Sequence, residues 1–290
     1  ADMISGTELV EAARLLLADS ESDPALIAEA LSLPGEEYLA EQMDEVDVDG
    51  IHAARDFVKS AIAQELEQEF IERRESLRAV RYSKSAAAMA RRSLRNVCLS
   101  YLMHTGAGAD IAAEQLRDSD NMTDTLAALR GMVWAGTSGA DAALEAFEVK
   151  WRPDALVMDK WFSIQASKPG RETVERVRKL LDHPAFSITN PNKVRSLIGG
   201  FSLMNPTGFH AADGSGYRLL ADLILQLDAL NPQVAARMAS AFNPWTRYDV
   251  DRQRLMKVEM QKIAGAAALS PDVSEIVNNA LKMQHEGSYS

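Results

Sequence analysis

Apolar residues recur at every third or fourth position along most of this 290-residue chain. This spacing places them on one face of a helix, whereas a half-buried strand needs strict alternation of apolar and polar residues. No alternating run is longer than about four residues. The clearest helical segment is 49–70, which we expect to form one long helix. Its apolar positions are Ile51, Ala54, Val58, Ile62, Leu66 and Phe70.

Capping residues divide the pattern into about fifteen short helices. Ser5 and Glu8 form a capping box for the first helix, and Pro24 opens the next. Short helices with short connections pack as antiparallel neighbours and stack into a curved, superhelical layer of the HEAT or armadillo kind. No strict repeat period is present, so the expected stack is irregular. We therefore predict an all-α fold with residues 1–290 in a single domain.

Two Asn-Pro pairs, at positions 190–191 and 231–232, mark helix starts of the same kind. Asparagine caps the free amides of a first helical turn, and proline fits the next position because it has no N–H to satisfy. Arg195 follows the first start. Gln233 and Arg237 follow the second, with a spacing that puts them on one helix face. Two guanidinium groups and an amide suit carbonyl and carboxylate groups, which the far end of a peptide offers.

Nearby carboxylates provide an alternative for this trio of polar residues. Arg195 and Arg237 would then pair with local acids such as Asp213 or Asp228. Residue types alone favour this local pairing, because arginine is most often found on a surface beside an acid.

The connection 205–216 is rich in Asn, Pro, Gly and Ser, and it is too long and polar to be a plain turn. We expect it to be ordered and structural. Its Gly214-Ser215-Gly216 run lacks the G-x-S-x-G spacing of a nucleophile elbow, and no strand precedes it. The run is better explained as a loop that lets a helix start at Tyr217.

The chain has 47% hydrophobic residues and a net charge of −11. The hydrophobic content supports a sizeable core, and the acidic balance argues against nucleic acid as a partner. Residues 1–76 hold 20 acidic and 5 basic side chains, whereas residues 77–290 hold 22 and 26. This asymmetry indicates either a docking surface or a solvated acidic face. We expect the basic residues from Arg73 to Arg95 to face the acidic part.

The sequence contains no complete catalytic or metal site. Its five histidines are not spaced for metal binding, and the helical zinc motif H-E-x-x-H does not occur. The single cysteine, Cys98, lies in an apolar run, so we expect a buried thiol and no need for an oxidising compartment. No apolar run approaches the ~18 residues of a membrane helix, and no signal peptide is visible. We therefore expect a cytoplasmic domain without catalytic residues or a bound cofactor.

Six motifs of the chain resemble the bacterial aminopeptidase N family. They are DNMTD followed by LAAL (120–129), VMDKWF (157–162), NPNKVRSLIG (190–199), FHAADGSGY (209–217), NPQVAAR (231–237) and RYD (247–249). The motifs occur in the order and spacing of the family, and the resemblance runs from about Pro24 to Leu281. It is a resemblance to the C-terminal helical domain of these zinc aminopeptidases. The missing initiator Met agrees with a piece of a longer protein.

The resemblance implies a domain that caps a separate catalytic domain and encloses an internal chamber. In the family, the zinc ligands and the general base lie upstream, where a zinc-bound water attacks the first peptide carbonyl. The chamber-facing residues of the family fall on Arg195, Gln233 and Arg237. The implied role of this trio is to bind the peptide substrate beyond the bond that is cut. The implied partners are that peptide and the upstream catalytic domain of the same polypeptide, with zinc only in the full-length enzyme.

Two other functions stay open from the sequence. A free-standing, non-catalytic helical scaffold would bind a partner protein on its concave face. An H-E-x-x-H motif upstream in the same reading frame would instead support the peptidase. A domain that hydrolyses peptides alone would show turnover when the isolated chain is assayed with zinc, and we expect none.

Overall fold

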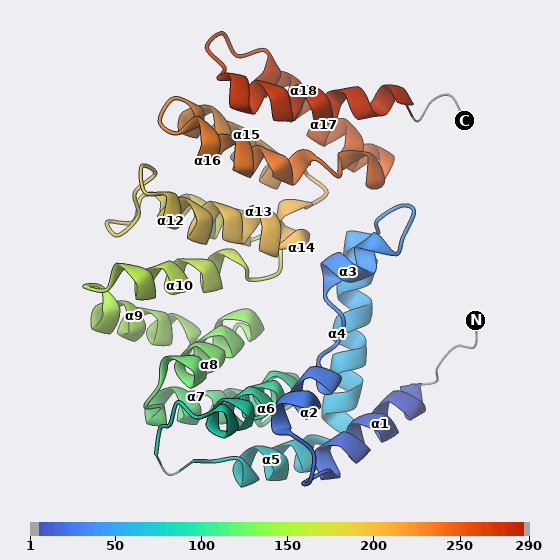
Figure 1. Cartoon of the computed structure of the whole chain (residues 1–290), viewed down its shortest axis with the longest axis vertical. Coiled ribbons are helices and arrows are strands. Elements are labelled where there is room, and N and C mark those ends of the chain that lie inside the picture. The colour runs from blue at the N-terminus through green and yellow to red at the C-terminus, as the bar shows by residue number, and fades with distance from the viewer. Residues whose placement is uncertain (1–5, 80, 287–290) are drawn as a thin grey trace. The chain divides into compact units, whose positions relative to one another are not determined.

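The computed structural model describes residues 6–79 and 81–286, and the side chains of that part up to residue 282 (Figure 1). Within this part every regular element is helical, which confirms the all-α prediction. The predicted cap Ser5 lies outside the described residues. The α-helices are α1 (Gly6–Ala18), α2 (Pro24–Leu31), α3 (Glu36–Glu41), α4 (Val48–Glu65), α5 (Glu67–Ser76), α6 (Ala86–Leu102), α7 (Gly108–Asp118), α8 (Met122–Ala135), α9 (Ala140–Trp151), α10 (Ala155–Ala166), α11 (Thr173–Leu181), α12 (Pro191–Val194), α13 (Gly200–Met204), α14 (Pro206–Phe209), α15 (Ser215–Asp228), α16 (Pro232–Ala239), α17 (Val250–Ala264) and α18 (Pro271–Glu286).

Three further helical turns complete the described part of the chain. The turn η1 (Arg195–Gly199) is a π-helix that joins α12 to α13. The turns η2 (Ser240–Phe242) and η3 (Trp245–Arg247) are 3-10 helices between α16 and α17. Within the same part, no helix is long and apolar enough to cross a membrane.

The single long helix expected over 49–70 is in fact two helices. The helix α4 ends at Glu65 and α5 begins at Glu67, because Leu66 leaves the helical conformation with φ −120° and ψ 22°. Leu66 itself is fully buried. The break redirects α5 so that Phe70 stacks on Tyr101 of α6, with ring centroids 4.7 Å apart. Periodicity could not show this break, because the apolar spacing continues through it.

The chain forms two compact units, residues 1–35 with 52–146 and residues 36–51 with 147–290. The single domain expected from the sequence stays a prediction. In the first unit, α6 packs against α2, α5 and α8, and α7 packs against α8. The Tyr101 hydroxyl of α6 donates a hydrogen bond of 2.6 Å to the carbonyl of Leu31 at the end of α2. Cys98 lies in this core with no exposed surface, and burial raises the pKa of its thiol to about 12, which confirms the predicted core thiol.

The second unit is built from helices that pack in pairs along the chain. The helix α15 packs against α16 and α17, α16 packs against α18, and α10 packs against η1. Aromatic side chains fill the space between these helices, and Phe209 meets both Tyr217 and Phe242. The buried indole of Trp245 donates to the carbonyl of Ala280, 2.8 Å away, and so ties η3 to α18.

Candidate functional site

Both predicted Asn-Pro helix starts are present and capped as expected. The side-chain oxygen of Asn190 accepts hydrogen bonds from the amides of Asn192 at 2.9 Å and Lys193 at 3.4 Å. The side-chain oxygen of Asn231 accepts from the amide of Val234 at 3.2 Å. In each helix the proline occupies the first turn, where its missing N–H leaves no partner unsatisfied. The sequence therefore located the start of both helices that carry the trio.

Arg195 lies where the helical geometry changes. It is the first residue of the π-helical turn η1, and the amide of Gly200 bonds back to its carbonyl. A π-turn inserts one extra residue into a helix, and such turns are frequent at functional sites. The side chain of Arg195 is exposed. This turn could not be predicted from the sequence, because residues 195–199 contain no proline or other signal that separates a π-turn from an α-turn.

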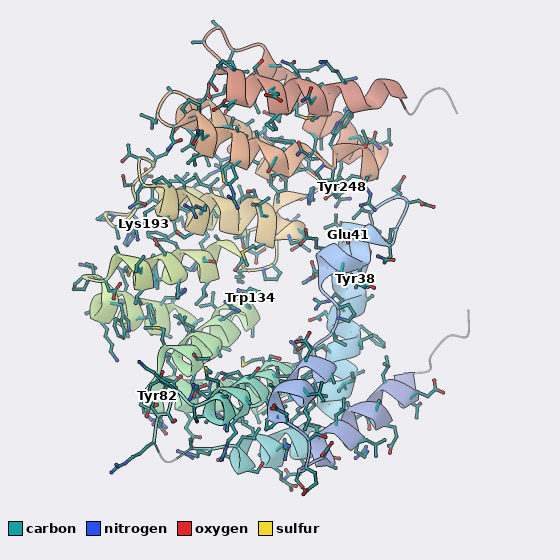
Figure 2. All side chains as sticks on the ribbon, in the orientation of Figure 1. Tyr38, Glu41, Tyr82, Trp134, Lys193 and Tyr248 are labelled. Carbon is teal, nitrogen blue, oxygen red and sulfur yellow. The ribbon has the colours of Figure 1, made fainter. Side chains whose placement is uncertain are left out.

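A buried ion pair holds the helix that leads into Arg195. The ammonium group of Lys193 lies 2.8 Å from the carboxylate of Asp159 on α10 and donates to the carbonyl of Ala155, also 2.8 Å away. It also lies over the ring of Phe162, 5.4 Å from the centroid. Lys193 is labelled in Figure 2 at the start of this helix. Lys193 is a positioning residue that sequence reasoning did not single out, since its partner is on another helix.

Gln233 and Arg237 are both exposed on α16, whereas Ala235 and Met238 face the core. Their spacing of four residues puts them on one face, as predicted. A Cβ added at Gly199, the last residue of η1, would lie 3.8 Å from the terminal methyl of Met238. The helical segments that carry Arg195 and Arg237 are therefore neighbours in the second unit, although no hydrogen bond joins the trio among the described residues.

The two acids named in the local-pairing alternative have other partners. Asp213 accepts from the amide of Ser215 at 2.8 Å. Asp228 accepts from both the amide and the hydroxyl of Ser270. None of the ion pairs within residues 6–79 and 81–282 involves Arg195 or Arg237, so local pairing with these two acids is not what the structure shows.

The connection 205–216 is ordered, and it is more helical than expected. It contains the short helix α14, and α15 begins at Ser215, two residues before the predicted start at Tyr217. Asn205 is almost fully buried, and its side-chain amide donates to the carbonyls of Ala166 at 3.1 Å and Lys168 at 2.5 Å. This connection therefore fastens α13 and α14 to the end of α10, which is a structural role.

A buried polar network follows the same connection. His210 lies 2.8 Å from the hydroxyl of Tyr217 through its Nδ1 and stacks on Tyr248, with centroids 4.2 Å apart. Arg252 donates from Nε to the carbonyl of His210 at 2.8 Å and from Nη1 to Asp249 at 2.8 Å. Burial, helped by the nearby Arg252, lowers the pKa of His210 to about 3. The ring therefore stays neutral at physiological pH and serves as a packed, hydrogen-bonded core residue.

One Ser, His and Asp group in the first unit resembles a nucleophile triad in composition only. The hydroxyl of Ser60 lies 3.0 Å from Nδ1 of His104, and a carboxylate oxygen of Asp56 lies 3.5 Å from the same nitrogen. A relay needs the serine and the acid on opposite ring nitrogens, so this geometry does not activate Ser60. Among the described residues, no group of three or more His, Cys, Asp and Glu side chains is arranged to hold a metal ion.

The predicted pairing of the basic cluster with the acidic part of the chain is only partly correct. Arg78 approaches Glu75 at 3.6 Å, but it also approaches Glu114 and Asp118, which lie beyond the acidic part. Arg95 pairs with Asp124, 3.5 Å away. The acids beyond the acidic part come from α7 and α8, which helix packing places beside these arginines. The distribution of charge along the sequence does not predict which helices become neighbours.

The chain matches known proteins over nearly its whole length. The family described as "Domain of unknown function (DUF3458_C) ARM repeats" matches residues 2–282. Aminopeptidase N of Haemophilus influenzae is 39% identical over 275 residues, which cover 95% of this chain and 32% of that protein. Aminopeptidase N of Escherichia coli is 38% identical over 275 residues, which cover 94% and 32%.

Two further matches agree with these. Aminopeptidase N of Caulobacter vibrioides is 37% identical over 289 residues, which cover 97% of this chain and 33% of the relative. A crystal structure of Legionella pneumophila aminopeptidase A in complex with aspartic acid matches with a TM-score of 0.88 and 32% identity, over 97% of this chain and 34% of that one. This chain thus spans about a third of the length of the relatives it matches. It belongs to the DUF3458_C family of ARM-repeat domains and is homologous to the C-terminal part of bacterial aminopeptidase N.

Proposed function

We propose that this chain is the part of a zinc aminopeptidase that encloses the active-site chamber, and that Arg195, Gln233 and Arg237 bind the distal part of the peptide substrate. The complete enzyme would remove single amino acids from peptide N-termini. This chain would contribute to binding and leave the hydrolytic step to a catalytic domain of the same polypeptide.

The proposal rests on the exposure of Arg195, Gln233 and Arg237 and on the other partners of the acids that could have paired with the two arginines. All three side chains are exposed on capped, neighbouring helical segments, and the nearby acids Asp213 and Asp228 are engaged elsewhere. Exposed guanidinium and amide donors on packed helical segments suit the carbonyl oxygens and the terminal carboxylate of a peptide. The homology to aminopeptidase N supplies the peptide as the substrate class.

The described residues do not fit a zinc site, since none of their His, Cys, Asp and Glu side chains form a ligand cluster. When zinc is bound elsewhere in the full-length enzyme, it would activate the attacking water. The residues of this chain would hold the peptide in place during that step.

Arg237→Ala in the full-length protein tests the role of the trio. We expect the KM for a tetrapeptide to rise by about 10-fold to 100-fold, because a hydrogen bond to a charged group is removed. An aminoacyl amide lacks the distal part of a peptide, so its kcat/KM should change much less. Steady-state kinetics on both substrates measure the difference, and equal losses on the two would contradict the proposed contact.

The control is Arg254→Ala, which removes an arginine from α17 that is 71% exposed and, among the described residues, pairs only with Asp251 of its own helix. Its kinetics on both substrates should match those of the unmodified enzyme. The isolated chain, assayed with added zinc, should show no peptide hydrolysis. Turnover that survives purification and disappears with a chelator would contradict the assignment of hydrolysis to another domain.

A further inference from the structure

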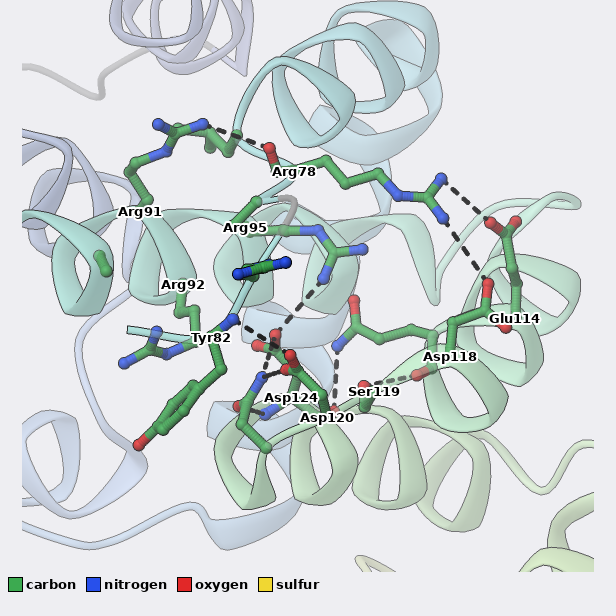
Figure 3. A pocket seen from close by; sticks show the side chains of 16 residues that line it. Arg78, Tyr82, Arg91, Arg92, Arg95, Glu114, Asp118, Ser119, Asp120 and Asp124 are labelled. Carbon is green, nitrogen blue, oxygen red and sulfur yellow. Dashed lines mark hydrogen bonds and ion pairs between the residues drawn. The ribbon is translucent and has the colours of Figure 1, made fainter. Parts of the chain in front are cut away.

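The first unit contains a polar cavity of about 330 Å³ beside the first turns of α6 (Figure 3). Its walls come from the connection between α5 and α6, from α6 itself, from the end of α7 and from the start of α8. The positions that α6 contributes share one helix face, because they are spaced by three or four residues. Five arginines line the cavity: Arg78, Arg81, Arg91, Arg92 and Arg95.

Acidic residues also line the cavity. At one end, Glu114 and Asp118 form ion pairs with Arg78. Its guanidinium approaches Glu114 at 3.5 Å and Asp118 at 3.6 Å. Figure 3 shows these two carboxylates and Arg78 together on one side, with Arg91, Arg92 and Tyr82 on the other. Asp118 also pairs with Arg117, 3.2 Å away, so the cavity has one end where acids and arginines are paired and one basic end.

The two remaining acids are engaged with hydrogen-bond donors. Asp120 accepts from the amide of Tyr82 at 3.1 Å. Asp124 is 6% exposed and accepts from the side-chain amides of Asn96 at 2.8 Å and Asn121 at 3.0 Å. These contacts hold both carboxylates against the wall, where they fix the start of α8.

Three arginines of the basic end keep unused donors. Within the described part of the chain, Arg91 donates only to the backbone carbonyls of Ser76 at 3.4 Å and Arg78 at 3.3 Å. Arg92 donates to the carbonyl of Ser83 at 2.8 Å and lies over the ring of Tyr82. Arg95 is 13% exposed and meets Asp124 at 3.5 Å, while its buried Nε has no acceptor within the described part of the chain. Neither Arg91 nor Arg92 is among the ion pairs of that part.

Another buried arginine lies beside the cavity and is paired with Glu75, 2.5 Å away. Arg74 is 3% exposed, and it bonds to Gln115, which lines the cavity, at 3.0 Å. Burial lowers the pKa of Arg74, and the charge of the neighbouring Arg95 lowers it further. Like charges this close are unfavourable, and an anion at the basic end would offset them.

We propose that the basic end of this cavity, formed by Arg91, Arg92 and Arg95, binds a small multivalent oxyanion. Planar guanidinium groups recognise phosphate and carboxylate groups through paired N–H donors. The cavity has room for a molecule larger than a single phosphate ion. The ligand class is therefore a small metabolite with several phosphate or carboxylate groups.

Calorimetric titration of the 290-residue chain tests this proposal, with pyrophosphate and citrate as probes at constant ionic strength set with NaCl. Saturable binding of either probe supports the proposal, and the two probes distinguish a phosphate-bearing from a carboxylate-bearing ligand. The double variant Arg91→Gln/Arg92→Gln should weaken that binding by at least about tenfold. Both positions lie at the surface of α6, so the double variant should fold normally. Its far-UV circular dichroism spectrum, recorded without anion, checks this.

Two further variants make the outcome decisive. Asp120→Asn removes a negative charge from the same wall and should tighten anion binding. Arg254→Gln removes an exposed arginine that does not line the cavity and should leave binding unchanged. The proposal is overturned if neither probe saturates, if the double variant binds as tightly as the unmodified chain, or if Arg254→Gln weakens binding as much as the double variant does.

Discussion

Arg252 on α17 donates a hydrogen bond of 2.6 Å to the carboxylate of Asp49, 203 positions earlier in the chain. The same guanidinium bonds to Asp249 and to the carbonyl of His210. One side chain, only 12% exposed, thus joins three segments of the second unit. His210 follows α14 and contacts Tyr217 of α15, and α15 packs against α16, which carries Gln233 and Arg237.

Arg252→Gln should lower the free energy of unfolding by about 2 kcal/mol, since it breaks hydrogen bonds to two charged partners and to a buried carbonyl. The ion pair with Asp49 should contribute little to this free energy, because that carboxylate is 69% exposed and screened by solvent. Urea unfolding followed by far-UV circular dichroism measures the change. Arg254→Gln is the control and should stay within about 0.5 kcal/mol of the unmodified chain. Equal effects of the two variants would show that the buried contacts contribute nothing.

His210 should remain neutral from pH 8 to pH 5, because burial and the adjacent Arg252 lower its pKa to about 3. An unperturbed imidazole titrates near pH 6.5, so the unfolded chain binds a proton in this range while the folded chain does not. Folding stability should therefore fall by about 1.4 kcal/mol for each pH unit between pH 6.5 and the folded-state pKa of about 3 on account of this residue.

Ring resonances in carbon–proton correlation spectra test this expectation directly, with His210→Phe to identify the signal. The signal of His210 should not shift between pH 8 and pH 5. The phenylalanine variant should also show a flatter decline of stability between pH 6.5 and pH 4.5. A midpoint near pH 6.5 for His210 would contradict the buried, neutral ring.

Asn205→Asp should destabilise the fold by about 2 to 4 kcal/mol, although the two side chains have nearly the same shape. The side chain is 1% exposed, and its amide group donates to the carbonyls of Ala166 and Lys168. A carboxylate there would face two carbonyl oxygens without a proton to share. The pKa of the new carboxyl would be raised, so the loss should be largest at neutral pH and shrink as the pH falls toward 4.

Denaturant unfolding at pH 7 and at pH 4.5 measures the effect of Asn205→Asp. The matched control is Asn192→Asp, at an exposed position in the first turn of α12, where a negative charge is favourable. The control should be neutral or slightly stabilising. A pH-independent loss at position 205 would argue against repulsion between oxygen atoms as its cause.

Gly216→Ala should destabilise by about 2 kcal/mol or more, although alanine is the better helix former. The new Cβ would clash with the carbonyl oxygen of Phe209 and would lie 2.8 Å from its Cα, both of them backbone atoms that cannot move aside cheaply. Gly35→Ala is the matched control, because nothing lies within 4 Å of its added Cβ. Thermal unfolding should separate the two variants by several degrees, and equal midpoints would exclude the close approach of Phe209.

Local sequence signals predicted the elements that local physics controls. Asn190 and Asn231 cap their helices as expected, because an asparagine oxygen and a following proline satisfy a first helical turn without help from the rest of the fold. The same spacing rules placed Gln233 and Arg237 on one face. The pattern did not predict that the side chains of the trio are exposed or that Arg195 begins a π-turn.

Local sequence signals could not predict contacts between segments that are far apart in the sequence. Lys193 and Asp159 both occur in motifs that identified the family, yet their ion pair depends on how α12 packs against α10. The break at Leu66 accompanies the packing of Phe70 on Tyr101 and leaves no mark in the apolar spacing. Residue types and spacing describe one helix at a time, and they do not specify which helices become neighbours.

The sequence by itself determined that this protein is all-α, where its two Asn-Pro helices begin, and which three polar residues follow those starts. These features depend on hydrogen bonds and periodicities that span only a few residues. The tertiary structure alone decided that Asp228 binds Ser270, that Arg252 reaches Asp49, and that five arginines meet around one cavity. Those relationships arise from packing between helices, because only the folded chain fixes the distance between residues far apart in sequence.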